Sequence, residues 1–229
     1  PGIGGLYDLV ESFIDGGQSY DWSACDDDKD CTSVPGLVED FYESAWTVRD
    51  LVAGLESSGV VLFDQGGDFR LDKLLVLLGD KYREEIAYPM VAGETSDDII
   101  LKALYADHAS MVLRDTNPAQ PDLGTFSPQI ADDHPVQPAA FATQTRAVDF
   151  ITSAQVYALP GRTIVVERID TTEVGVSIFV NYLRDGSAHI FGDAYDRPAF
   201  LQGNRIPLVA GEPLSITSPY GGIVFLEVG

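Results

Sequence analysis

Histidine is scarce in this 229-residue sequence, which contains only His108, His134 and His189. None of the three begins an H-E-x-x-H motif, the spacing that puts two zinc ligands on one face of a helix. His108 lies on an apolar helical stripe, where a packed histidine is more common than a metal ligand. No local pattern indicates a Ser-His-Asp or Cys-His arrangement, although such groups also assemble from distant residues. The sequence therefore predicts no catalytic residue and no bound cofactor in this chain.

The two cysteines, Cys25 and Cys31, enclose a short acidic loop. Two cysteines at this spacing, with no others in the sequence, favour a disulfide. A disulfide implies an oxidising compartment, so we expect an extracellular, cell-surface or periplasmic location. The alternative is a pair of reduced thiols in a cytosolic protein. A zinc site is disfavoured because no further cysteine or histidine lies nearby to complete the four ligands.

Within this loop Asp26, Asp28 and Asp30 alternate in the way that begins a calcium-binding loop. A calcium site needs several oxygen ligands that converge, and the rest of the motif is missing. Cys31 occupies the position of the turn glycine, and Leu37 that of the bidentate glutamate. We therefore expect an exposed acidic turn, with calcium binding as the alternative.

Aromatic and charged residues come together once more in Asp193, Tyr195, Asp196 and Arg197. An aromatic ring beside carboxylates and a guanidinium can stack on a sugar and hydrogen-bond its hydroxyls. An ordinary surface loop has the same composition, and we favour that interpretation over a glycan contact.

The elements that position these residues differ between the two halves of the chain. Apolar residues recur every three or four positions in 6–14, 35–56 and 71–86, which predicts three helices, with Gly79 as a candidate break in the third. Thr95 and Asp98 resemble a capping box and predict a fourth helix that continues to residue 112. The short apolar run 60–63 is either a strand or an extended link.

The second half is typical of β structure. Short apolar runs about ten residues apart, separated by Gly and Pro turns, predict a sandwich; the runs are 155–159, 162–169, 174–183, 206–209, 214–217 and 223–228. The predicted fold class is α+β: a helical domain (1–116), a proline-rich linker or wrapping segment (117–140) and a mainly antiparallel β-sandwich (141–229).

The formal net charge is −22, and the first fifty residues hold twelve acidic side chains against two basic ones. Such a field repels phosphate, which disfavours nucleic acids and anionic membranes as partners. No apolar run reaches the roughly 20 residues of a transmembrane helix. Because the chain begins at Pro1 without methionine, we expect a fragment of a longer protein.

Three segments of the β half, 157–168, 197–209 and 216–226, carry a family resemblance. They resemble the β-sandwich that precedes the catalytic domain in enhancin-like zinc metallopeptidases. That group includes the bacterial immunomodulating metalloprotease and the accessory colonization factor lipoproteins. In this pattern Pro160 and Pro219 begin turns, and Gly161, Gly221 and Gly222 permit positive φ within them.

The resemblance implies a parent enzyme that cleaves mucin-type O-glycosylated host proteins with zinc. The family's catalytic residues are an H-E-x-x-H helix and a downstream glutamate, and no position of this sequence matches them. We therefore expect a non-catalytic accessory region, with zinc in the parent's catalytic domain and with that domain, O-glycoproteins or glycans as partners. The alternatives are a carbohydrate-binding or adhesion module of a bacterial surface protein and a purely structural spacer.

Overall fold

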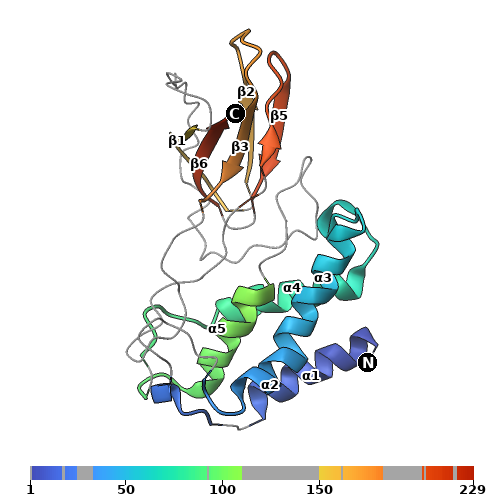
Figure 1. Cartoon of the computed structure of the whole chain (residues 1–229), viewed down its shortest axis with the longest axis vertical. Helices are drawn as coiled ribbons and strands as arrows, with labels where there is room; N and C mark the ends of the chain where they lie inside the picture. The colour runs from blue at the N-terminus through green and yellow to red at the C-terminus, as the bar shows by residue number, and fades with distance from the viewer. Residues whose placement is uncertain are drawn as a thin grey trace. The chain divides into compact units, whose positions relative to one another are not determined.

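The structure, a computed structural model, describes residues 2–16, 19–24, 33–91, 93–109, 150–160, 162–182, 203, 205–218 and 221–229. The described residues up to 109 belong to a helical unit, and those from 150 onward to a β unit (Figure 1). Helices followed by antiparallel strands confirm the predicted α+β class. The proposed linker, 117–140, lies outside the described residues, so the domain boundaries remain a prediction.

The helical unit contains the four predicted helical regions. Its α-helices are α1 (Ile3–Asp15), α2 (Leu37–Phe41), α3 (Thr47–Ser57), α4 (Arg70–Arg83) and α5 (Asp97–Ala109), and η1 (Trp22–Ala24) and η3 (Leu62–Asp64) are 3-10 turns. The run 60–63 therefore forms no strand, and Leu62 and Phe63 are buried in η3. None of the helices in these described parts of the chain is long and apolar enough to cross a bilayer.

The predicted helix at 35–56 is one helical rod with a π-helical segment, η2 (Tyr42–Trp46), between α2 and α3. Within η2 the hydroxyl of Ser44 donates to the carbonyl of Asp40 at 3.1 Å. The hydroxyl of Thr47 donates to the carbonyl of Tyr42 at 2.9 Å. Side chains that bond to backbone carbonyls in this way compete with the regular helical ladder.

Gly79 does not break α4, contrary to the prediction, because it is the point of closest approach to α5. A Cβ on Gly79 would lie 3.1 Å from the Cα of Ala106 and 3.3 Å from the Cβ of Ala109. The predicted capping box at Thr95 is also wrong. The Thr95 hydroxyl accepts from the amide of Val91 at 3.2 Å, and α5 begins two residues later.

The β unit consists of two antiparallel sheets with a shared core. Its strands are β1 (Phe150–Ala158), β2 (Thr163–Glu167), β3 (Val176–Val180), β4 (Ile206–Pro207), β5 (Pro213–Thr217) and β6 (Gly222–Val228). Strands β1-β6-β3-β4 form one sheet and β2-β5 the other. Ile178, Val224 and Leu226 of the larger sheet pack with Ile216 of the smaller one. The inner faces of the two sheets therefore make the apolar core of a sandwich.

Two turns of the family pattern meet at the end of β1. Gly221 (φ 62°) and Gly222 (φ 137°) have the positive φ that the sequence predicted. The carbonyl of Gly221 accepts a hydrogen bond from Nδ2 of Asn181 at 2.7 Å. A Cβ on Gly221 would lie 2.6 Å from Cδ of Pro160. Segments about sixty residues apart in sequence therefore depend on each other for their conformation.

Candidate functional site

The residues predicted to form the disulfide, the calcium site and the glycan contact lie outside the described parts of the chain. These are Cys25, Asp26, Asp28, Asp30 and Cys31 in the acidic loop, and Asp193, Tyr195, Asp196 and Arg197 in the β half. The disulfide, calcium and glycan-contact hypotheses for these positions therefore remain predictions. Among the residues that are described, no group of three or more His, Cys, Asp and Glu side chains could hold a metal ion.

His108 is a packed histidine, as its place on an apolar stripe indicates. It is 9% exposed, its ring meets Phe41 edge-on with centroids 4.5 Å apart, and Trp46 lies beside it. Its Nδ1 is 3.0 Å from the carbonyl oxygen of Leu104, one turn earlier in α5. This environment fixes the imidazole between α5 and the π-helical segment, which is a structural role.

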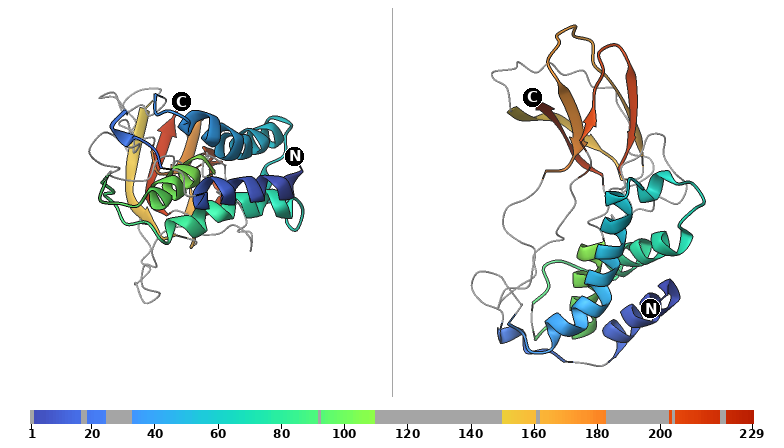
Figure 2. Two further views of the ribbon diagram at one scale, coloured as in Figure 1. Left: turned by 90° about the horizontal axis from the view of Figure 1, so that it is seen from below. Right: turned by 45° about the vertical axis from the view of Figure 1, so that its right-hand side comes forward.

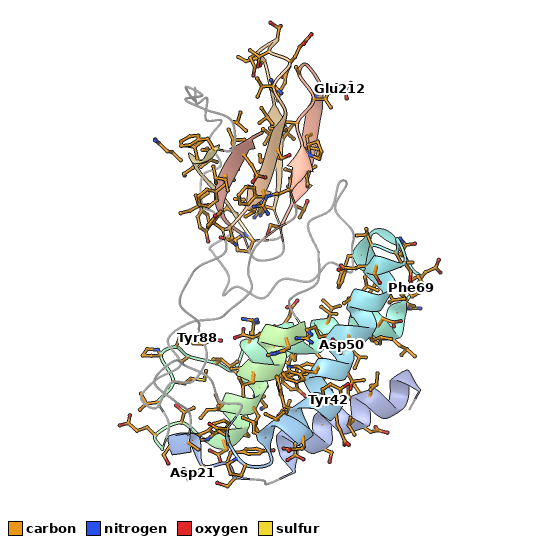
Figure 3. All side chains as sticks on the ribbon, in the orientation of Figure 1. Asp21, Tyr42, Asp50, Phe69, Tyr88 and Glu212 are labelled. Atoms are coloured by element: carbon orange, nitrogen blue, oxygen red, sulfur yellow. The ribbon has the colours of Figure 1, made fainter. Side chains whose placement is uncertain are left out.

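A buried ion pair joins α4 to α5. The guanidinium of Arg83 donates to Asp107 at 2.7 Å, and the two side chains are 1% and 0% exposed. Tyr88, in the connection between these helices (Figure 3), has a raised pKa because burial, and then the charge of Asp107, disfavour its phenolate. Tyr105 donates to the carbonyl of Leu75 at 2.5 Å in the same region. These contacts hold the two helices together.

Helices α1 and α4 lie side by side (Figure 2, left), and residues of both helices line an apolar groove. It has a volume of about 610 Å³, and its lining residues are Gly4, Tyr7, Asp8, Leu71, Leu74, Leu75, Leu77, Leu78 and Lys81. Leu71 and Leu74 are 54% and 55% exposed, although periodicity placed both on the buried stripe of this helix. The buried side of α4 instead includes Lys73, whose ammonium donates to the carbonyl of Gly66. The groove could receive an apolar segment, and Tyr7, Asp8 and Lys81 are the titratable residues in its lining.

The second surface lies on the outer face of the larger sheet, the side turned away from the core. Register places Phe179 of β3 opposite Phe225 of β6, and Ile223 of β6 opposite Tyr157 of β1. Strict alternation along a strand then puts all four side chains on one face. Tyr182 follows β3, and its ring lies 5.8 Å from that of Phe225.

A charged pair completes this surface. The guanidinium of Arg205, which precedes β4, lies 4.8 Å from the centroid of the Phe179 ring. Its Nε donates to Oε2 of Glu227 at 2.6 Å. We call this surface the aromatic face, and it consists of Tyr157, Phe179, Tyr182, Arg205, Ile223, Phe225 and Glu227.

Exposure divides the aromatic face into a buried base and an accessible rim. Phe179 is 1% exposed and stacks on Phe225 with centroids 5.6 Å apart and planes 16° from parallel. Tyr157, Tyr182 and Ile223 are 53%, 46% and 43% exposed. Sequence reasoning predicted these strands but missed the face, because its members come from four segments that only strand register brings together. The signal that could have found it is the alternation of Ile223, Phe225 and Glu227.

Comparison with known proteins identifies relatives for both units. Residues 7–115 match the family model for the immunomodulating metalloprotease helical domain. The immunomodulating metalloprotease of Pseudomonas aeruginosa is 29% identical over 98% of the chain. The predicted resemblance to the immunomodulating metalloproteases is confirmed. The chain spans 25% of the length of that curated relative.

Solved structures agree with the sequence comparisons. The IMPa metallopeptidase from Pseudomonas aeruginosa superposes with a TM-score of 0.66 and 26% identity, over 97% of this chain and 26% of that one. A structure of IMPa in complex with an O-glycopeptide, at 24% identity, covers the same shares with a TM-score of 0.62 and supports the fold alone. The turn motifs that carry the resemblance lie in the β half, whereas the family model matches the helical half. The similarity to the Pseudomonas metalloprotease therefore covers almost the whole chain.

Proposed function

We propose that this chain is a non-catalytic accessory region of a secreted or cell-surface zinc metallopeptidase that acts on mucin-type O-glycoproteins. The observation that carries the proposal is the extent of the similarity to the Pseudomonas metalloprotease, which includes both units of this chain but only a quarter of the relative. The relative was solved in complex with an O-glycopeptide, which supports the proposed substrate class. In this proposal the helical and β units support or orient a catalytic domain encoded elsewhere in the same protein.

Zinc belongs to that catalytic domain in this proposal. A catalytic zinc site needs three protein ligands and an open position for water. The described residues offer no group of three or more ligating side chains, so they do not fit a zinc ion. The proposed extracellular, cell-surface or periplasmic location depends on the Cys25–Cys31 disulfide, which alkylation of the unreduced protein followed by mass spectrometry would test.

A cleavage assay tests the non-catalytic role. The purified 229-residue chain, with zinc added, is incubated with an O-glycosylated peptide, and the products are followed by mass spectrometry. We expect no cleavage by the chain and cleavage by the longer protein that contains it, with the latter abolished by a chelator. Zinc-dependent cleavage by the chain alone would overturn the proposal.

A second candidate is a carbohydrate-binding or adhesion module whose parent is not a peptidase. The aromatic face favours this possibility, since aromatic rings beside charged side chains suit sugar recognition. The remaining sequence of the encoded protein separates the two candidates. An H-E-x-x-H motif with a downstream glutamate supports the metallopeptidase, and its absence supports the adhesion module.

A further inference from the structure

We propose that the aromatic face of the β unit is a binding site for a neutral sugar residue of a glycan. This inference deepens the proposed function, because it gives the accessory region its own ligand. It concerns binding by this chain alone, so it can fail while the accessory role holds.

The groups on the aromatic face match the chemistry of a sugar. A sugar ring presents C–H groups on its faces and hydroxyls around its edge, so a site for it needs an apolar platform with polar groups beside it. Tyr182 and Phe225 supply the platform, with ring centroids 5.8 Å apart. Arg205 and Glu227 lie beside it and offer donors and an acceptor for hydroxyls.

The charges on and around the aromatic face favour a neutral ligand. Arg205 and Glu227 are 43% and 30% exposed and form an ion pair, so their charges cancel where a ligand would lie. The chain as a whole has a formal net charge of −22, which disfavours anionic ligands. A neutral ligand suits this surface better than a phosphate, a sulfated glycan or an acidic peptide.

The side chains of the aromatic face are already held in place without a ligand. The Arg205 guanidinium is held from two sides, by the ring of Phe179 at 4.8 Å and by the carboxylate of Glu227 at 2.6 Å. The ring of Tyr182 is held against both Phe179 and Phe225. Among the described residues, Nε is the only guanidinium nitrogen of Arg205 that donates a hydrogen bond, so its other nitrogens can donate to a ligand. Groups that are already ordered lose little conformational entropy on binding.

Tyr157 and Ile223 extend the platform on the β1 side. They are direct cross-strand partners, and both are more than 40% exposed. Since neighbouring strands lie about 4.8 Å apart, Tyr157 on β1 and the end of β3 stand about 10 Å apart across β6. This span would let the site contact more than one residue of an oligosaccharide.

Nuclear magnetic resonance titration of the intact 229-residue chain tests the proposal. The probes are galactose, N-acetylgalactosamine, N-acetylglucosamine and the T-antigen disaccharide, each added to millimolar concentration to isotopically labelled protein. We expect saturable shifts of backbone amides in β3 and β6 with at least one probe. If no probe shifts these amides, or if the shifts lie only in the helical unit, the proposal is wrong.

Substitutions then locate the site. Tyr182→Ala and Arg205→Ala should each weaken binding about tenfold, the loss expected for one well-placed aromatic or polar contact. Tyr182→Phe should bind nearly as well as the wild type, because it keeps the stacking ring. Tyr42→Ala, at a tyrosine of the helical unit that is 53% exposed, is the matched control and should leave affinity unchanged.

Two further outcomes would overturn the proposal. One is equal binding by wild type, Tyr182→Ala and Arg205→Ala, each shown to be folded by its amide spectrum. The other is concentration-dependent dimerisation that Tyr182→Ala abolishes, because the face would then be occupied by a second copy of the chain.

Discussion

Gly221 lies directly against Pro160, so close that a Cβ on the glycine would stand 2.6 Å from both N and Cδ of the proline ring. The two residues belong to the two turns that carry the family pattern in the β half. Gly221 also has φ 62°, a conformation that costs an alanine about 1–2 kcal/mol. This position therefore excludes a side chain for two independent reasons.

Gly221→Ala should destabilise the β unit by about 2–4 kcal/mol, the sum of the backbone cost and of the steric overlap with Pro160. Gly211→Ala is the matched control, because Gly211 also has positive φ (77°) but a Cβ added there would meet no atom within 4 Å. Gly211→Ala should lower the free energy of unfolding of the β unit by only about 1–2 kcal/mol. Hydrogen exchange of β1 and β6 amides measures the free energy of unfolding of the β unit in both variants. An equal decrease in the two variants would contradict the contact between Gly221 and Pro160.

Gly79→Val should destabilise the helical unit by about 1–3 kcal/mol, because its side chain would push α4 away from α5. The nearest atom to a Cβ there is the Cα of Ala106, a backbone atom that cannot rotate away. Gly54→Ala in α3, where a Cβ meets nothing within 4 Å, should instead stabilise the helix by up to about 1 kcal/mol. Urea unfolding followed by circular dichroism measures the free energy of unfolding of both variants. An unchanged value for Gly79→Val would contradict the close crossing of α4 and α5.

Asp107→Ala should lower the free energy of unfolding by about 3–5 kcal/mol, because it removes a buried carboxylate that pairs with the buried Arg83 guanidinium. Glu84→Gln is the control, since it removes the partner of Lys81 in an ion pair whose side chains are 65% and 59% exposed. We expect no measurable change from that substitution, because exposed pairs contribute little. Urea unfolding measures the free energy of unfolding of both variants. A small decrease for Asp107→Ala would mean that the pair of Arg83 and Asp107 is hydrated.

Asp170 links the stability of the β unit to pH. Two hydrogen bonds from Arg168, and then those from the hydroxyl and amide of Thr172, hold the pKa of Asp170 well below its usual range. A folded-state pKa below the unfolded value stabilises the fold at neutral pH. This contribution declines as the pH falls below the ordinary value of about 3.9 and is lost as the pH passes the folded-state pKa.

Asp170→Asn should therefore lower the thermal midpoint at pH 7, and the difference from wild type should narrow between about pH 4 and pH 2. Glu212→Gln, at an exposed carboxylate of the same unit (Figure 3), is the control. A difference that stays constant over this range would show that the carboxylate of Asp170 contributes no charge-dependent stabilisation.

Periodicity predicted the helices and strands well, because the apolar residues of α1, α3 and β6 recur at the spacing of the buried faces of these elements. It was wrong at Gly79, where a glycine serves helix crossing and not helix termination. It was also wrong at Leu71 and Leu74, because a single sequence does not show which side of α4 meets its neighbours. The π-helical segment had no signal in the pattern, since it depends on hydroxyl bonds to backbone carbonyls.

The aromatic face was beyond sequence reasoning for a different reason. Arg205 and Phe179 are distant in sequence, and only the antiparallel pairing of β3 with β4 and β6 brings them together. The family resemblance, in contrast, was readable from local turns, because Pro160 and Gly221 have conformational requirements that their residue types reveal.

The most direct test of the accessory role is the rate at which the longer protein cleaves an O-glycosylated peptide, measured with and without residues 1–229. Both forms are first shown to be folded and to bind equal amounts of zinc. We predict slower cleavage by the truncated form. Equal rates for the two forms would contradict the proposal that this chain assists the peptidase.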